Sequence, residues 1–296
     1  MKFCRFADER FGLVRDGAIY DVSALADRVV AQQPRVKRGD AYVAALPQIA
    51  RAVDGADLGA PVARVDDAVL LSPVATPTKL IAAPVNYQAH IDEAEADKGI
   101  TFNHAVARID QAGLFLKATS SLVGVGEGVA VRFPERRTDH EIELALVIGE
   151  TCANLTRENA LDVVAGYAMG LDMSIRGTED RSMRKSIDSY SVLGPWLVTA
   201  DEIADPDNLN FWLKVNGEIR QQANTNMLLR DVRHLIVWAS EWYTLYPGDV
   251  IYTGTPEGVA PVKAGDVMTA EMDRIGAMRV ECRAAATAPV LANSAR

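Results

Sequence analysis

The sequence predicts an α+β fold that is mainly β, with a curled or barrel-like roll of strands after a small N-terminal module. Many short apolar runs are separated by Gly and Pro, few segments have helical periodicity, and the C-terminal third repeats a Gly-Asp turn before a strand. The 296 residues are 49% hydrophobic, which suffices for one large domain, or one large and one small. We expect a small domain over residues 1–76, a large domain over 77–285 and a disordered tail over 286–296.

The N-terminal module is predicted to be a few short strands with one helix. An Asp-Gly pair at residues 16 and 17 is a hairpin signal between two of the strands. The expected elements are strands at residues 3–6, 11–14 and 18–20, an amphipathic helix at 41–53, and a connector at 55–78 that carries one strand.

The second part of the chain has buried strand-like runs separated by a few helices and loops. The expected strands lie at residues 80–83, 141–148, 196–198, 211–215, 247–251 and 263–268, with a hairpin at 275–277. The expected helices lie at residues 88–97, at 156–168 with Thr156 as N-cap, and at 227–242. Residues 98–113 have weak periodicity, and we expect them to form a mobile loop or lid.

Charge and motif content exclude several classes of function. With a net charge of −9, the chain lacks the basic surface that nucleic-acid binding requires, and an anionic membrane surface would repel it. No segment is predicted to span a membrane. Three widely spaced cysteines, Cys4, Cys152 and Cys282, indicate reduced thiols, and with the apparent lack of a signal peptide they predict a cytoplasmic protein. The signatures GxSxG, HExxH and GxGxxG do not occur, which argues against the common serine hydrolases, zinc proteases and dinucleotide enzymes.

The sharpest local feature is a pair of glutamates at the start of the strand predicted at 141–148. Glu141 and Glu143 share one face of that strand, whose far end is apolar. Two half-buried carboxylates repel each other and lose hydration, and a hard divalent cation relieves both effects. From the spacing alone, two exposed glutamates at a solvent edge are the more common arrangement. Asp172, isolated after a buried apolar run, is the best candidate for a third ligand, although a cap or turn residue fits it equally well.

Other candidate groups are individually weak. His90 and Glu93 share a helix face, where a carboxylate can orient an imidazole and raise its basicity as a general base for water requires. A lysine near a metal, such as Lys185, could stabilise a substrate carboxylate or an oxyanion, and Arg176 has the same ambiguity. The turn over residues 253–259 contains Thr255 and could bind a carboxylate, or be an ordinary tight turn.

Taken together and in order, these pieces resemble the fumarylacetoacetate hydrolase family over roughly residues 79–283. The motifs that carry the resemblance are Asn86-Tyr87 with His90 and Glu93, Lys117-Ala118-Thr119-Ser120-Ser121, Asp139-His140-Glu141-Ile142-Glu143-Leu144, Asp172, Lys185-Ser186, Leu193-Gly194-Pro195-Trp196, Val215-Asn216-Gly217 and Thr253-Gly254-Thr255-Pro256. The chain departs from the family pattern at Gly177, where many members have aspartate, and at Ala118, where proline is usual. Both departures lie where substrate preference can be set.

The resemblance implies a fold and a set of site residues. The fold is a mixed β-roll of the fumarylacetoacetate hydrolase type with a small N-terminal domain, usually in a homodimer. Three acids would hold a divalent metal, typically Mg²⁺ or Mn²⁺, with Ca²⁺ able to replace it in crystals. The implied residues are Glu141, Glu143 and Asp172 as metal ligands, His90, Glu93 and Lys185 as catalytic residues, and Tyr87, Lys117, Arg176 and Thr255 as substrate-binding residues.

The function that follows is cleavage of a carbon–carbon bond in a small 2-oxo acid, as in the catabolism of aromatic compounds. His90, oriented by Glu93, would take a proton from water, and hydroxide would attack the C4 carbonyl of a 2,4-dioxo acid such as an acylpyruvate or fumarylpyruvate. The products would be pyruvate or a relative and a carboxylic acid. Alternatives on the same metal site are an oxaloacetate decarboxylase and a 2-hydroxymuconate-type isomerase or decarboxylase. A non-catalytic metabolite-binding protein with the same fold is an alternative of another class.

Overall fold

The computed structural model describes residues 1–102 and 104–285, and its centre is a mixed twelve-stranded sheet. The main path of this sheet runs through β4 (Ala63–Arg64), β3 (Ala18–Asp21), β2 (Arg10–Arg15), β1 (Lys2–Phe6), β14 (Ser191–Thr199), β12 (Val164–Asp172), β11 (Ile142–Ile148), β17 (Val250–Tyr252), β6 (Leu80–Ala82) and β7 (Phe115–Lys117). Two short strands pair beside this path: β5 (Leu70–Leu71) with β1, and β8 (Leu122–Val123) with β14. The prediction of an α+β fold that is mainly β is confirmed.

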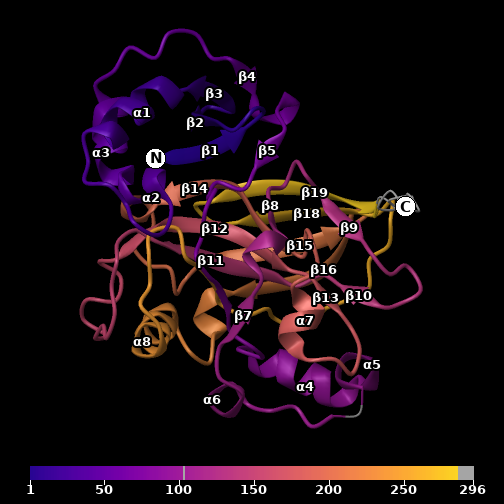
Figure 1. Cartoon of the computed structure of the whole chain (residues 1–296). Helices are drawn as coiled ribbons and strands as arrows, with labels where there is room; N and C mark the ends of the chain where they lie inside the picture. The colour runs from indigo at the N-terminus through magenta and orange to yellow at the C-terminus, as the bar shows by residue number, and fades with distance from the viewer. Residues whose placement is uncertain (103, 286–296) are drawn as a thin grey trace, which may run out of the picture.

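A second, five-stranded sheet lies beside the first (Figure 1). Its order is β16 (Glu218–Asn224), β15 (Asn210–Val215), β18 (Val267–Met272), β19 (Gly276–Ala284) and β9 (Val129–Val131), and a two-stranded ribbon joins β10 (Thr138–Asp139) to β13 (Ser174–Ile175). Most neighbouring strands are antiparallel, but β17 with β6, β14 with β8 and β19 with β9 are parallel. The mixture fits a roll in which long connections return strands to the same sheet.

Helices gather at two ends of the molecule. They are α1 (Ser23–Ala31), α2 (Ala41–Ala44), α3 (Leu46–Asp54), α4 (Gln88–Ala96), α5 (Lys98–Thr101), α6 (Ile109–Ala112), α7 (Arg181–Lys185) and α8 (Val232–Trp242). Figure 1 shows α1 and α3 beside the N-terminal strands, whereas α4 to α7 lie at the opposite end of the molecule. Among the described residues, none of the helices has the length and apolarity that a membrane crossing requires.

The N-terminal strands extend the central sheet. Strand β1 pairs antiparallel with β14, with Phe3 opposite Leu197. Helix α3 buries Ile49 and Val53 against the same face of the sheet, and these residues share one core cluster with Leu80 of β6. Residues 1–76 therefore contribute strands to the sheet that carries the rest of the fold, and the domain boundary near residue 76 stays a prediction.

Strands β11 and β12 form the middle of the central sheet and are buried on both faces. Ile142 and Leu144 belong to one core cluster, whereas Ala145 and Val147 belong to the other, as the alternation of side chains predicts. Opposite Glu143 lies Gly170, where an added Cβ would come within 2.5 Å of the Tyr252 ring, so the missing side chain makes room for that ring.

Some predicted elements differ from the structure. The helix predicted at 156–168 is wrong: residues 157–163 form turns, and strand β12 begins at Val164. The amide N–H of Thr156 donates to Asn159 Oδ1 at 2.8 Å, which closes a local turn in place of a helical cap. The loop predicted at 98–113 contains the short helices α5 and α6, and α8 begins after Asp231, whose carboxylate accepts from His234 N at 2.8 Å. The tail predicted at 286–296 lies outside the described residues.

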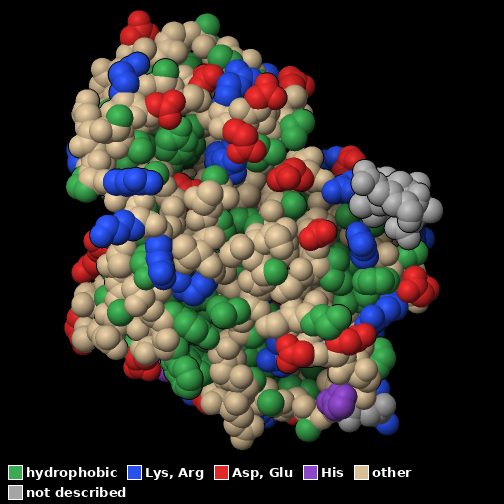
Figure 2. Space-filling view, viewed as in Figure 1, with side chains coloured by type: hydrophobic (Ala, Val, Ile, Leu, Met, Phe, Trp, Pro, Cys, Tyr) green, Lys and Arg blue, Asp and Glu red, His purple; other side chains and the backbone are tan. Residues whose placement is uncertain are grey.

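Charged side chains of both signs are interspersed over the face shown in Figure 2. The excess of acids over bases in the sequence is therefore not gathered into one patch on this face. An anionic ligand must find its positive charge in a local site, which directs attention to the cavities of the molecule.

Candidate metal centre and active site

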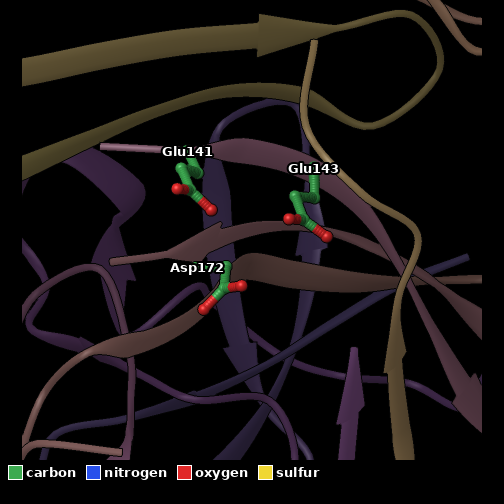
Figure 3. A group of neighbouring side chains, drawn as sticks. All are labelled: Glu141, Glu143 and Asp172. Atoms are coloured by element: carbon green, nitrogen blue, oxygen red, sulfur yellow. The ribbon is translucent and has the colours of Figure 1, made fainter. Parts of the chain in front are cut away.

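Three carboxylates converge where strand β11 begins and strand β12 ends. Each of Glu141, Glu143 and Asp172 offers an oxygen, and these oxygens all lie within 4.8 Å of one another. Figure 3 shows the three acidic side chains as neighbours. The side chains are 4%, 1% and 2% exposed, so the charges are removed from bulk water. Such a group costs free energy unless cations compensate it.

Strand pairing explains why these three acids meet. Glu141 and Glu143 are two residues apart, so they project from the same face. The backbone N–H of Asp172 donates to the carbonyl oxygen of Glu141 at 2.9 Å, which places Asp172 directly opposite Glu141 on the neighbouring strand. Residues that lie opposite each other on antiparallel strands share a face. The sequence pattern predicts the glutamate pair, and the register of β11 with β12 adds the aspartate.

Three cationic side chains surround the carboxylates. Lys185 Nζ donates to Glu141 Oε2 at 2.6 Å and to Asp172 Oδ2 at 2.8 Å. Lys117 Nζ donates to Asp172 Oδ1, and Arg176 donates to Glu141 Oε1 at 2.8 Å. Three carboxylates thus face three cations, and a bound divalent ion would leave the site positively charged, as an anionic substrate requires.

The pKa values of the two glutamates shift in opposite directions. Burial alone would raise the pKa of Glu141, but the adjacent Lys185 and Arg176 hold the pKa of this carboxyl well below its ordinary value. Burial and the negative charge of Asp172 raise the pKa of Glu143 well above its ordinary value. Glu143 receives a hydrogen bond from the Gly254 backbone N–H at 2.6 Å, which compensates only part of its charge. The cluster therefore retains one under-compensated carboxylate.

The residues present fit a divalent cation. The donor set consists of carboxylate oxygens alone, which suits hard ions such as Mg²⁺ and Mn²⁺. The raised pKa of Glu143 marks a position where a cation would lower the free energy of the ionised cluster. Glu141, Glu143 and Asp172 are the residues that could hold the ion.

His90 and Glu93 form a hydrogen-bonded pair on α4. His90 Nδ1 lies 3.0 Å from Glu93 Oε2, and Glu93 Oε1 accepts from the Gly258 backbone N–H at 2.9 Å. A carboxylate that accepts from Nδ1–H keeps Nε2 free of a proton, which is the tautomer that a general base needs. The pair predicted from its three-residue spacing is thus formed, and its carboxylate is anchored to the turn after β17.

A cavity of about 410 Å³ joins the acids to the imidazole. Its lining includes His90, the three acids and Thr255, together with Ile100 and Val106 from the segment predicted as a lid. The described part of residues 98–113 therefore lies over the cavity as the helices α5 and α6 and their connections. Arg181 and Arg184 of α7 line the same cavity.

The candidate substrate-binding residues are placed differently from one another. Thr255 lines the cavity, and its hydroxyl donates to the Ile142 carbonyl oxygen at 2.9 Å. Arg176 also lines the cavity, although its guanidinium already donates to two carboxylates. Tyr87 and Lys117 are buried and are not among the lining residues. The structure thus brings Thr255 and Arg176 to the cavity and leaves the other two side chains behind it.

A chain of ion pairs behind the site has no counterpart in the predictions. Asp139 is fully buried and accepts from Arg137 Nε and from Arg176 Nε, each at 2.8 Å. Arg137 also donates to Asp97 at 2.8 Å, and Asp97 caps α5 through its bond to Gly99 N. The chain therefore connects the segment predicted as a lid to Glu141 through Arg176. Asp139 stands two residues before Glu141, so strand alternation could have placed it on the same side.

Two buried amides also hold the site together and were not predicted. Asn86 donates to the carbonyl oxygens of Arg230 at 2.8 Å and Thr253 at 2.9 Å, which fixes the loop before α4. Gln221 accepts from Ile142 N at 3.1 Å and donates to Thr255 Oγ1 at 2.7 Å, which ties the two neighbouring segments together. Neither spacing nor periodicity distinguishes such amides from exposed ones.

Comparisons with known proteins agree with this arrangement. Residues 79–283 match the family model described as fumarylacetoacetate (FAA) hydrolase C-terminal. A maleylpyruvate hydrolase of Aquipseudomonas alcaligenes is 49% identical over 287 residues, covering 96% of this chain and 99% of that protein. A 2,4-didehydro-3-deoxy-L-rhamnonate hydrolase of Sphingomonas sp. (strain SKA58) is 35% identical, covering 94% and 95%.

A solved structure adds a bound metal to the comparison. The crystal structure of maleylpyruvate hydrolase from Sphingobium sp. SYK-6, in complex with manganese(II) ion and pyruvate, has a TM-score of 0.78 and 38% identity to this chain. The match covers 96% of this chain and 99% of the solved one. The similarity therefore extends over the N-terminal strands as well as the site.

Proposed function

The chain belongs to the fumarylacetoacetate hydrolase family, and we infer that it is a metal-dependent hydrolase that cleaves a carbon–carbon bond of an acylpyruvate. The observation that carries this function is the convergence of three buried carboxylates with the His90–Glu93 pair in one cavity. Manganese serves as a metal for a similar enzyme, and we propose that magnesium can replace it because both are hard cations that accept oxygen ligands.

We propose that Glu141, Glu143 and Asp172 hold the divalent cation. When bound, the cation supplies Lewis acidity at the 2-oxo acid end of the substrate and positive charge for the leaving enolate. Lys185 adds a fixed positive charge beside Glu141 and Asp172, where it can stabilise negative charge that develops on the substrate. Thr255 and Arg176 remain candidates for positioning the substrate at the wall of the cavity.

The proposed reaction begins at His90. With Nδ1 held by Glu93, the imidazole Nε2 accepts a proton from water while the water oxygen bonds to the C4 carbonyl carbon of a 2,4-dioxo acid. The C3–C4 bond then breaks, and its electron pair stays on C3 as the enolate of pyruvate. The proton held by His90 returns to C3, so that water has been added across the broken bond. The products are pyruvate and the carboxylic acid that contains C4.

The described segments over the cavity support a role in excluding water. Ile100, Val106 and Ala107 bring apolar surface to the lining opposite the acids. A drier site strengthens every charge interaction within it. We propose that the segment over 98–113 closes on the bound substrate, with the Asp97–Arg137 bond as its fixed end.

The other activities are not favoured. Two relatives that cover at least 94% of this chain are hydrolases, and the His90–Glu93 pair is suited to activate the attacking water that only the hydrolysis requires. A non-catalytic binding protein would not need the complete set of acids, base and lysine. The substrate proposed here is maleylpyruvate or a similar acylpyruvate, in the breakdown of aromatic compounds.

Assembly and location complete the proposal. We propose a homodimer, which light scattering of the purified protein would test. The three cysteines are unpaired, and burial raises the pKa of the Cys4 and Cys282 thiols to about 12, so these thiols are poorly reactive. We propose a cytoplasmic location because unpaired thiols suit a reducing compartment.

The test is a product assay with metal-depleted protein. Protein dialysed against EDTA is supplied with Mn²⁺ or Mg²⁺ and offered maleylpyruvate, fumarylpyruvate, an acylpyruvate without a second carboxylate and oxaloacetate, and the products are separated by liquid chromatography. We expect pyruvate from the dioxo acids only when metal is present. Carbon dioxide from oxaloacetate without cleavage of any dioxo acid would contradict the proposal.

A further inference from the structure

The short helix α7 turns three cationic side chains toward the cavity. Arg181, Arg184 and Lys185 are spaced by three and four residues, which places them on one face of the helix, and all three line the cavity. Met183 points away and is 70% exposed. Of these three cations, only Lys185 forms ion pairs with the acidic cluster within the described residues, so α7 brings more positive charge to the cavity than those pairs use.

Arg181 differs from the other two in its partners. Lys185 is bound to Glu141 and Asp172, and the Arg184 guanidinium donates to the carbonyl oxygens of Glu179 at 2.9 Å and Ile175 at 3.1 Å. Within residues 1–102 and 104–285, the side chain of Arg181 forms no hydrogen bond and no ion pair. A guanidinium stays charged even when it is half-buried, so Arg181 brings to the cavity wall a positive charge whose N–H donors have no protein acceptor within the described residues.

The Arg181 guanidinium is nevertheless held in place by an aromatic ring. Its central carbon lies 5.5 Å from the centre of the Phe115 ring, and Lys185 Nζ lies 5.7 Å from the same centre. Phe115 stands on β7 two residues before Lys117, so the ring and the lysine that binds Asp172 project from the same side of the strand. Stacking on a ring positions a guanidinium while its donors stay available.

The acids around Arg181 already have partners, since Glu141 and Asp172 bind Lys185 and the two acids just before Arg181 in the sequence are also engaged. Glu179 accepts from Arg136 at 2.8 and 3.0 Å, and Asp180 accepts from the backbone N–H of Ser182 at 2.8 Å as the cap of α7. The carboxylate that would complete the coordination of Arg181 must therefore come from a ligand in the cavity. An arginine fork binds a carboxylate through two parallel hydrogen bonds.

We propose that Arg181 binds a second carboxylate of the substrate, at the end remote from the 2-oxo acid, and so makes the enzyme selective for dicarboxylic acylpyruvates. This inference rests on the proposed function, which places the 2-oxo acid end at Glu141, Glu143 and Asp172. Arg181 and Lys185 are four residues apart, which is a rise of about 6 Å along a helix. Lys185 is bound to Glu141 and Asp172, whereas the Arg181 side chain is not, so Arg181 is left to bind the other end of a dicarboxylic substrate.

The experiment compares the selectivity of R181Q, R181K and wild-type enzyme. For each, kcat/KM is measured with Mn²⁺ for maleylpyruvate, which has the second carboxylate, and for 2,4-dioxopentanoate, which lacks it. The matched control is R233Q, because Arg233 is half-buried like Arg181 but lies on α8 outside the cavity lining. Thermal unfolding of all proteins verifies that they are folded.

We expect kcat/KM for maleylpyruvate, divided by kcat/KM for 2,4-dioxopentanoate, to fall in R181Q on the order of ten- to a hundredfold, because a hydrogen bond between charged groups is lost. R181K should lose part of that ratio because lysine keeps the charge but lacks the fork, and R233Q should keep the wild-type ratio. A wild-type ratio in R181Q, or equal losses on both substrates, would overturn the inference. If R181Q does not fold, the R181K ratio decides in the same way.

A binding measurement separates this inference from the proposed function. Maleate, the dicarboxylic product of the proposed cleavage, is titrated into metal-free wild-type, R181Q and R181K proteins in a calorimeter. Weaker binding to the folded variants supports the role of Arg181, and equal heats overturn it. If wild-type enzyme with Mn²⁺ cleaves neither substrate, the proposed function fails, and this titration still decides whether Arg181 binds a carboxylate.

Discussion

Replacement of Glu143 with glutamine tests the acidic cluster in two opposite ways. The substitution keeps the shape of the side chain and removes one of three clustered negative charges. In the metal-free protein, burial and the charge of Asp172 raise the pKa of Glu143. A carboxyl whose pKa is higher in the folded state than in the unfolded state stabilises the fold at pH values below its unfolded-state pKa. This contribution is lost as the pH rises through the folded-state pKa. E143Q should therefore be more stable than metal-free wild type at neutral pH, and less dependent on pH.

The response to metal should change in the opposite direction. Manganese at a hundred times its dissociation constant adds about 2.7 kcal/mol to the unfolding free energy of the wild type. That corresponds to a rise in Tm of roughly 5–10 °C if a domain of this size gains 2–4 °C per kcal/mol. If loss of the Glu143 ligand weakens affinity on the order of a hundredfold, the same manganese concentration adds only about 0.4 kcal/mol to E143Q.

The assay is differential scanning calorimetry of EDTA-dialysed proteins, with and without Mn²⁺, at several pH values. E241Q is the matched control, since Glu241 is an exposed glutamate of α8. A wild-type increase in Tm with manganese in E143Q would refute the ligand assignment. An E143Q protein that loses stability with rising pH as the wild type does would refute the charge argument.

Three further predictions follow from the site. E93Q should lower kcat by roughly 10²- to 10⁴-fold because His90 loses the carboxylate that orients it, while the manganese affinity measured by calorimetry stays near that of wild type; a kcat near wild type would contradict the dyad. Below its raised pKa, Glu143 must lose a proton to bind manganese, so manganese affinity should increase with pH. Calorimetric titrations in two buffers of different ionisation enthalpy measure the released protons, and equal heats in both buffers would contradict the prediction. R137M should free Asp97 and speed hydrogen exchange over residues 98–102, whereas unchanged exchange there would show that the ion pair does not anchor this segment.

Sequence periodicity was sufficient to predict which site residues lie close together when both residues belong to the same strand or helix. The two-residue spacing of Glu141 and Glu143 places them on one face, and the three-residue spacing of His90 and Glu93 forms the hydrogen-bonded pair. Asp172 needed more, because its position depends on the register of β12 against β11. The resemblance to a family supplied that residue, since spacing alone could not distinguish it from a cap.

The errors and omissions have physical causes. Residues 157–163 form turns, and from Val164 the chain is a strand because it pairs with β11 on one side and β14 on the other, so the helix predicted at 156–168 does not form. The buried link from Arg137 to Asp139, and the lack of a partner for the Arg181 guanidinium among the described residues, are properties that only the folded chain determines. In the sequence alone, each of these charged residues looks like an ordinary solvated side chain.

The central claim is that Glu141, Glu143 and Asp172 hold one divalent cation beside His90. Diffraction from crystals soaked with Mn²⁺ and pyruvate, recorded on both sides of the manganese absorption edge, locates the ion directly. The account predicts a single strong anomalous peak within coordination distance, about 2.2 Å, of an oxygen from each of the three carboxylates. A peak elsewhere, or a cluster that stays bound only to Lys117 and Lys185 at saturating manganese, would contradict it.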